Sequence, residues 1–176
     1  PVAARSWDIS PDGKTYTFHL RQGMTWSNGD ALTAQDFAYA WLRALNPDTG
    51  ADNAYMLYAI KNGEAYNSGK ATENTVGIKV LDQETLVVTL EEPTPYFLSL
   101  TAFHAYYPLD RKVVEAHPKD WASRPETLVG NGPYKMTAWK HSGDMHFVKN
   151  ESYWDAKSVK TQAMYWPISE SSSTRL

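Results

Sequence analysis

Residues 7–47, WDISPDGKTYTFHLRQGMTWSNGDALTAQDFAYAWLRALNP, decide the local fold of this chain. Within them, Pro11-Asp12-Gly13 has the composition of a tight turn, because proline fixes φ, aspartate can bond its own backbone and glycine adopts positive φ. Apolar and polar residues alternate on both sides of this turn, as in antiparallel strands with one buried face. The sequence therefore predicts a hairpin whose apolar positions are Trp7, Ile9, Tyr16, Phe18 and Leu20.

The second half of the same stretch predicts a capped amphipathic helix. Residues 27–30, SNGD, form a turn after Trp26. Thr33 is a favourable N-cap, and Asp36 three residues later is a weaker form of the capping box. Apolar residues then recur at helical spacing until Asn46-Pro47 ends the pattern. The predicted apolar stripe comprises Phe37, Ala40, Trp41, Ala44 and Leu45.

Composition indicates a globular protein. Of the 176 residues, 42% are hydrophobic, and the formal net charge is −3. No apolar run approaches the ~18–20 residues of a membrane-spanning helix, and no block of lysine or arginine would attract nucleic acid. Because cysteine is absent, a thiol nucleophile, a disulfide scaffold and a cysteine-ligated metal site are excluded.

Aromatic residues are abundant, with 7 Trp and 11 Tyr. Such side chains often form broad contact surfaces in binding proteins. The simpler interpretation, which we favour, is that many of them fill the core or the contacts between lobes.

Beyond Pro47 the sequence predicts two more hairpins and a final strand. Residues 82–85 and 142–144 are the polar turns of these hairpins. The predicted strands are 76–80, 86–90, 134–139, 145–149 and 161–168.

Short helices are expected between these strands. Residues 54–66 read as one or two of them. Pro93-Thr94-Pro95 is expected to open a buried helix that Thr94 caps, and Asp110 is expected to cap another that ends at Ala116. Because helices and hairpins follow one another without βαβ alternation, we expect an α+β fold of mostly antiparallel hairpins.

A change of domain is expected near Gly130-Asn131-Gly132-Pro133, where glycine and proline interrupt the pattern. The tail, residues 169–176, has little to bury and is expected to fray. No apolar leader is visible in residues 1–5, an absence that a mature chain and a trimmed chain would share and that says little about secretion.

No motif in the sequence indicates catalysis or a cofactor. His141 and His146 flank a turn that holds Asp144, but their spacing matches no metal-ligand motif, and we favour solvated turn residues. The adjacent carboxylates Glu91 and Glu92 would point to opposite faces of a strand, which does not suit paired-carboxylate hydrolysis.

Other catalytic and modification patterns are equally weak. No serine lies in a Gly-x-Ser-x-Gly elbow, and residues 130–132 lack the lysine of a phosphate loop. Residues 150–152, NES, fit the glycosylation sequon, which often arises by chance. We therefore expect neither an enzyme nor a metal protein.

Five further segments follow the opening stretch in an order that resembles a known family. Together they resemble the bacterial extracytoplasmic solute-binding proteins of the oligopeptide and dipeptide family over essentially the whole chain. The segments are VGIKVLD (76–82) with TL (85–86), EPTPYF (92–97), GNGPY (130–134), YWD (153–155) and PI (167–168).

The resemblance implies one part of a three-lobed, class II periplasmic-binding-protein-like fold. Such proteins close over an extended peptide and deliver it to the membrane permease of an ABC importer. Residues 1–130 are then expected to form the small second lobe, and residues 131–176 to be strands of the first. The remaining lobes of the parent would lie outside this chain. The expected location is extracytoplasmic, either periplasmic or at the cell surface with a lipid anchor.

The resemblance also places a peptide cleft along two segments, and it leaves nickel complexes and sugars as other possible ligands. Asn53 stands where well-known members have tyrosine, and Phe103 where they have histidine. The acidic group that receives the peptide amino terminus is expected outside this chain. The predicted ligand-binding residues are Asn53, Tyr55, Phe103, His104 and Tyr106.

Two other functions are kept as alternatives to an oligopeptide-binding fragment. A hydrolase would need a cleft with a perturbed carboxylate or a Ser–His contact. A stand-alone carbohydrate-binding or adhesion module would gather tryptophans on one open face: Trp26, Trp121, Trp139, Trp154 and Trp166.

Overall fold

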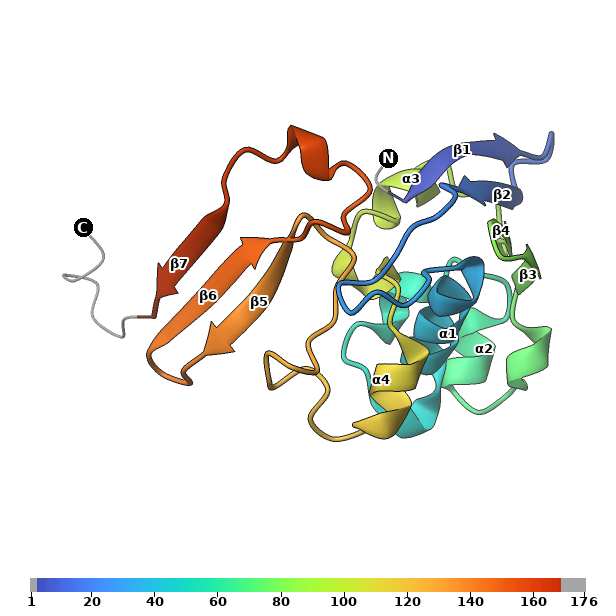
Figure 1. The fold of residues 1–176 in the computed structure, drawn as a ribbon. Coiled ribbons are helices and arrows are strands. Elements are labelled where there is room, and N and C mark those ends of the chain that lie inside the picture. Colours follow the sequence, from blue (N-terminus) through green and yellow to red (C-terminus); the bar gives the residue numbers. More distant parts are fainter. Residues whose placement is uncertain (1–2, 169–176) are drawn as a thin grey trace. The chain divides into compact units, whose positions relative to one another are not determined.

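A computed structural model of the chain describes residues 3–168 and consists of two compact units (Figure 1). The first unit comprises Pro1–Gln22 and Thr33–Arg111, and the second comprises Gly23–Leu32 and Lys112–Leu176. The second unit takes in residues 23–32 because the Ser27 amide donates to the Gly130 carbonyl at 2.9 Å and the Thr25 hydroxyl donates to the Ser152 carbonyl at 3.3 Å. The division into lobes at residues 1–130 and 131–176 stays a prediction, and the tail 169–176 lies outside the described residues.

A four-stranded antiparallel sheet in the order β1-β2-β4-β3 organises the first unit. It confirms both predicted hairpins, with Trp7 opposite Phe18 in the first and Val80 opposite Leu86 in the second. Strands β2 and β4 also pair with each other, which joins the two hairpins into one sheet. The strands are β1 (Ala4–Ile9), β2 (Thr15–Leu20), β3 (Ile78–Asp82) and β4 (Thr85–Thr89).

One face of this sheet is buried at its centre, as period-two alternation requires. Trp7 and Ile9 of the edge strand β1 stay partly exposed, at 37% and 48%. The buried positions of the two central strands are Tyr16, Phe18 and Leu20 in β2, and Leu86 and Val88 in β4.

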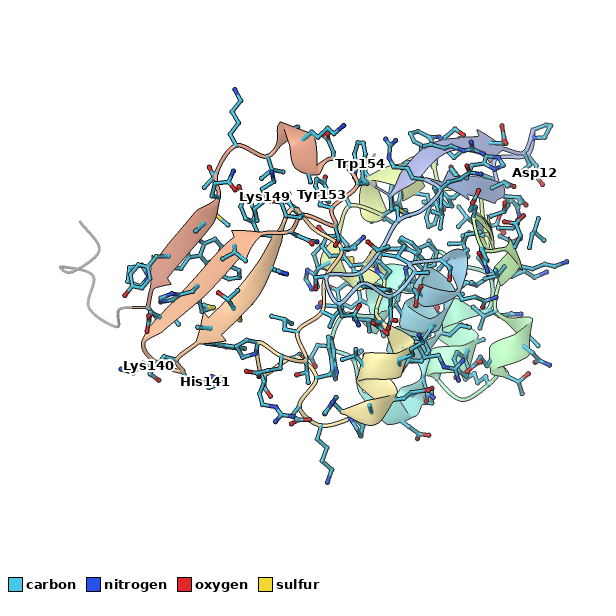
Figure 2. The ribbon with its side chains drawn as sticks, in the orientation of Figure 1. Asp12, Lys140, His141, Lys149, Tyr153 and Trp154 are labelled. Carbon is cyan, nitrogen blue, oxygen red and sulfur yellow. The ribbon has the colours of Figure 1, made fainter. Side chains whose placement is uncertain are left out.

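The β1–β2 turn has the predicted chemistry. Gly13 has a φ of +69°, which glycine adopts without strain. The carboxylate of Asp12, labelled in Figure 2, accepts hydrogen bonds from the Ser10 hydroxyl and the Lys14 amide. These hydrogen bonds hold the pKa of Asp12 below its ordinary value of 3.8.

Helix α1 (Ala34–Leu45) confirms the predicted capped helix. The Asp36 carboxylate accepts the Thr33 backbone N–H at 2.8 Å, which completes the capping box. The helix ends at Asn46, directly before Pro47. Its buried face consists of Ala34, Phe37, Ala38, Ala40, Trp41 and Leu45.

The helix predicted after Pro93 is much shorter than expected. Thr94 does not cap it, because the Thr94 hydroxyl donates back to the Glu92 carbonyl at 3.0 Å. The helix, α3 (Phe97–Leu100), begins after Tyr96, which is 63% exposed. Only Phe97 of this helix is buried, so the prediction of a buried helix capped by Thr94 is wrong.

The remaining helical elements of the first unit are single turns. Four of them precede the second hairpin in the sequence, and η4 follows it. They are η1 (Pro47–Thr49), η2 (Ala54–Leu57), α2 (Gly63–Asn67), η3 (Glu73–Thr75) and η4 (His104–Tyr106).

Aromatic rings connect the sheet to these helices. Phe97 lies 4.9 Å from Tyr16 and 5.9 Å from Tyr106, measured between ring centroids. Tyr106 in turn packs edge-on against Trp41 at 5.1 Å. The Trp41 indole N–H donates to the Tyr106 carbonyl at 2.9 Å. These residues show that a large part of the aromatic content of the first unit fills its core.

Gly77 occupies a position where no side chain fits. Its amide donates to the Lys61 carbonyl at 2.9 Å, and its carbonyl accepts from the Thr89 amide at 2.7 Å. A Cβ at this position would lie 2.3 Å from the Thr89 carbonyl oxygen. Because the Thr89 backbone and the Lys61 Cβ, 2.9 Å away, would have to move, we expect Gly77→Ala to lower the free energy of unfolding by about 1–3 kcal/mol in urea denaturation.

The matched control for this substitution is Gly130→Ala. No heavy atom lies within 4 Å of a Cβ at Gly130. We expect this variant to change the free energy of unfolding by no more than about 0.5 kcal/mol. Equal stabilities of the two variants would contradict the argument.

The second unit contains a three-stranded antiparallel sheet in the order β5-β6-β7. This arrangement confirms the third predicted hairpin and the final strand. Lys140 and His141 lie at the β5–β6 turn (Figure 2). The strands are β5 (Tyr134–Trp139), β6 (Asp144–Lys149) and β7 (Ala163–Pro167). The helical elements are α4 (Arg111–Ala116) and η5 (Ala156–Ser158). Helix α4 begins at Arg111, the last residue of the first unit.

Two buried residues of this unit have structural roles. Trp26 is buried together with Met24 and Leu32. Asn150, the first residue of the glycosylation sequon, donates to the Gly132 carbonyl at 2.9 Å and accepts the Ser152 amide at 3.1 Å. Asn150 is 1% exposed and its side chain closes a turn, so the sequon has a packing role here.

Candidate functional site

The turns η2 and η4 bring three of the predicted ligand-binding residues together, namely Asn53, Phe103 and His104. Asn53 directly precedes η2, and His104 opens η4. The Asn53 side-chain amide lies 3.1 Å from Nε2 of His104, across 51 positions of sequence.

Phe103 packs against His104, and Tyr106 fixes the η4 turn that carries it. The Phe103 ring lies 4.1 Å from the His104 ring, between centroids. The Tyr106 hydroxyl donates to the Met56 carbonyl at 2.7 Å, which ties η4 to η2. The ring contact restricts the imidazole, and the hydrogen bond restricts the turn on which it lies.

The five predicted residues differ in how far a ligand can reach them. His104 is exposed, Tyr55 is 56% exposed, and Asn53 and Phe103 are half-buried. Tyr106 is only 2% exposed, and burial raises its pKa above the ordinary value of 10. Tyr106 is therefore a buried residue that supports its more exposed neighbours. Contact of any of the five residues with a ligand stays a prediction.

Tyr107 is a further aromatic residue that the sequence reasoning missed. It follows η4 directly and is exposed, and its hydroxyl lies 3.4 Å from the Ala102 carbonyl. The adjacent pair Tyr106-Tyr107 was the available signal, because one residue of such a pair is often buried while the other faces outward.

The exposed and half-buried residues of η2, η4 and their flanking positions are here called the η2/η4 surface: Asn53, Tyr55, Phe103, His104 and Tyr107. They offer aromatic faces, an amide and an imidazole. Aromatic faces stack on flat or apolar groups, and the amide and imidazole form hydrogen bonds. Such a surface suits the binding of a polar ligand with apolar side chains.

The candidate metal residues take separate partners. His141 Nε2 lies 3.1 Å from the Ser123 carbonyl, whereas His146 Nε2 lies 2.6 Å from the Asp144 carboxylate. Within residues 3–168, no group of three or more His, Cys, Asp or Glu side chains is placed to hold a metal ion.

The five tryptophans proposed for a carbohydrate-binding or adhesion module do not share one open face. Trp26 is buried, while Trp121 and Trp139 are half-buried and Trp154 and Trp166 are exposed. Figure 2 shows Trp154 beside Tyr153, and their rings lie 5.7 Å apart. This distribution does not favour the alternative function.

In the described part of the chain, no helix combines the length and the apolar character needed to cross a bilayer.

Comparison with known sequences identifies the family. Residues 1–176 match the profile of the bacterial extracellular solute-binding proteins, family 5. The dipeptide-binding protein DppE of Bacillus subtilis is 46% identical over 168 residues, which cover 96% of this chain and 31% of DppE. The oligopeptide-binding protein OppA of the same organism is 47% identical over 169 residues, with the same coverage. The chain thus spans about a third of the length of the curated relatives it matches.

Comparison with solved structures also finds oligopeptide-binding proteins. The substrate-binding domain of an oligopeptide ABC transporter from Bacillus anthracis matches with a TM-score of 0.96 and 44% identity, over 99% of this chain and 34% of that chain. Listeria monocytogenes OppA bound to peptide matches with a TM-score of 0.94 and 38% identity, over the same fractions. These matches confirm the predicted α+β fold of a periplasmic-binding-protein-like lobe.

The family profile matches residues 1–176, and the sequence identities and structural matches agree with it. This chain therefore belongs to the bacterial extracellular solute-binding proteins, family 5.

Proposed function

We propose that this chain is part of the substrate-binding component of an ABC-type peptide importer. The component captures oligopeptides outside the cytoplasmic membrane and delivers them to a membrane permease. The observation that carries this proposal is the match to peptide-bound OppA from Listeria monocytogenes over 99% of the chain. Because the chain covers only 34% of that protein, capture by closure requires the other lobes of a longer protein.

The proposed location is extracytoplasmic. Similar oligopeptide-binding proteins of Salmonella typhimurium and Escherichia coli are named periplasmic. A free periplasmic protein and a lipid-anchored protein at the cell surface are both consistent with membership of this family. In either place the component would act by binding, without catalysis.

We assign the η2/η4 surface as one wall of the peptide cleft. The Asn53 amide and the His104 imidazole can bond the peptide main chain, directly or through water. Tyr55 and Phe103 supply aromatic faces for side chains of varied size. A polar amide at position 53 and a phenyl ring at position 103 give this wall its own preference among peptides.

Calorimetry on the longer protein tests the function. We expect tripeptides to pentapeptides of mixed sequence to bind with micromolar or tighter affinity. Binding of sugars or nickel complexes in the absence of any peptide binding would contradict the proposal.

A variant of His104 tests the site. His104→Ala removes one hydrogen-bonding group and one ring, so we expect peptide affinity to fall about tenfold, since ~1.4 kcal/mol corresponds to one decade. His141→Ala is the matched control, because His141 lies on the β5–β6 turn away from this surface in sequence and contacts Ser123. Equal peptide affinities of the two variants would mean that His104 does not contact the bound peptide.

A further inference from the structure

The dipeptide Asn-Gly occurs three times in the sequence, at residues 28–29, 62–63 and 131–132. Asparagine is a thermolabile residue, and a following glycine leaves its own backbone nitrogen unhindered because it has no Cβ. That nitrogen can attack Cγ of the asparagine side chain, and ammonia leaves as a succinimide ring closes. One water molecule then opens the ring, which gives aspartate or isoaspartate. The folded structure decides which of the three pairs reacts most readily.

Hydrogen bonds hold the first pair, which lies in the turn after Trp26. The Gly29 amide donates to the Trp26 carbonyl at 2.9 Å, and Oδ1 of Asn28 accepts the Asp30 amide at 3.0 Å. The attacking nitrogen and the attacked side chain are therefore both engaged. Since Asn28 and Gly29 are exposed to solvent, this pair is protected by its hydrogen bonds and not by burial.

The second pair lies at the start of helix α2 and is buried as well as bonded. Gly63 is buried, and its amide donates to the Ile60 carbonyl at 2.8 Å. The Asn62 side-chain amide donates to the Thr75 carbonyl at 3.0 Å, and the Asn62 backbone N–H donates to the Glu91 carboxylate at 2.9 Å. The attack at this pair requires local opening of the helix start.

The third pair, just before strand β5, lacks these restraints. Within residues 3–168, neither the Gly132 amide nor the Asn131 side chain takes part in a hydrogen bond. Asn131 and Gly132 are half-buried. The space beside Gly132 is open, because no heavy atom lies within 4 Å of a Cβ at this position. No hydrogen bond has to break before the Gly132 nitrogen reaches the asparagine side chain.

The main chain on both sides of this pair is fixed. The Gly130 amide donates to the Ser27 hydroxyl at 3.2 Å, and the Gly130 carbonyl accepts the Ser27 amide at 2.9 Å. The Gly132 carbonyl accepts the Asn150 side-chain amide at 2.9 Å, and the Pro133 carbonyl accepts the Asn150 backbone N–H at 2.9 Å. Isoaspartate would add one carbon to the main chain between these two anchored points, so at least one set of hydrogen bonds would be displaced.

We infer that Asn131 is a deamidation site of the folded protein and that it reacts first among the three Asn-Gly pairs. The aspartate product adds one negative charge and keeps the main chain. The isoaspartate product adds the same charge and lengthens the main chain between Gly130 and Gly132, which destabilises the second unit. The inference concerns the stability of the chain and is independent of its peptide ligand.

Peptide mass spectrometry tests the inference on the longer protein, kept folded at mildly alkaline pH. We expect Asn131 to convert about tenfold faster than Asn28 or Asn62, because a hydrogen bond to the attacking nitrogen protects by up to about one decade. The same protein in urea is the control, since the three pairs should then react at similar rates. Conversion of Asn28 as fast as that of Asn131 in the folded protein would overturn the inference.

Two variants test the chemical route. Gly132→Ala places a Cβ in the open space beside the attacking nitrogen, so we expect conversion at position 131 to fall about tenfold while the fold is kept. Asn131→Gln is the second variant, because its longer side chain would have to close a six-membered ring, and we expect almost no conversion. Unchanged conversion in either variant would overturn the inference.

Urea denaturation after ageing tests the consequence for stability. We expect the aged wild-type protein to contain a fraction that unfolds at lower urea concentration, and isoaspartate at position 131 should be enriched in that fraction. Asn131→Asp is the matched control, because it adds the charge without lengthening the main chain, and it should unfold like the fresh protein. Equal isoaspartate contents in the early-unfolding and late-unfolding fractions would contradict the predicted effect on the second unit.

Discussion

The 176-residue chain on its own is expected to bind peptides at least about a hundredfold more weakly than the longer protein. In the proposed site, the η2/η4 surface is one wall of the cleft, with Asn53 and His104 as its hydrogen-bonding side chains. Hydrogen bonds to charged groups are worth about 1.5–3 kcal/mol each, and ~1.4 kcal/mol corresponds to a decade of affinity. Losing two such bonds from the absent lobes already removes two decades or more.

Calorimetry with the same tripeptides to pentapeptides, on both proteins, measures this difference. Circular dichroism of the shorter chain verifies that its strands and helices have formed, so that weak binding is not caused by unfolding. Micromolar binding by the 176-residue chain would show that the missing lobes contribute little. The cleft would then have to lie entirely within the residues described here.

Trp41→Ala is expected to lower the free energy of unfolding of the first unit by about 3–5 kcal/mol, as large-to-small changes of buried aromatic residues do. Trp41 is 3% exposed and packs between Phe37 and Tyr106. Its removal leaves a cavity and also deprives the Tyr106 carbonyl of its hydrogen bond from the indole N–H. Because Tyr106 ties η4 to η2, the same variant should loosen the η2/η4 surface.

Trp7→Ala is the matched control in the same unit. Trp7 lies on the edge strand β1 and is far more exposed than Trp41. Urea denaturation should show a loss of no more than about 1 kcal/mol for this variant. Similar losses for the two tryptophan variants would mean that the aromatic cluster around Trp41 does not hold the unit together.

The candidate site illustrates what a pattern of residues can and cannot provide. Family resemblance predicts that Asn53 and residues 103–106 lie near a cleft, because the order of segments along the chain is shared. It could not provide the Asn53–His104 contact, which joins positions 51 residues apart. Nor could it separate exposed Tyr107 from buried Tyr106, since the side on which each ring lies depends on how η4 packs against Trp41.

Local sequence determined the β1–β2 hairpin and the start and end of α1. Turn chemistry at Pro11-Asp12-Gly13 and the Thr33–Asp36 capping box act within a few residues, so they are readable without a structure. The tertiary structure alone decided the pairing of β2 with β4, the joining of residues 23–32 to the second unit and the shortening of α3. These depend on contacts between distant segments, whose burial outweighs local preference.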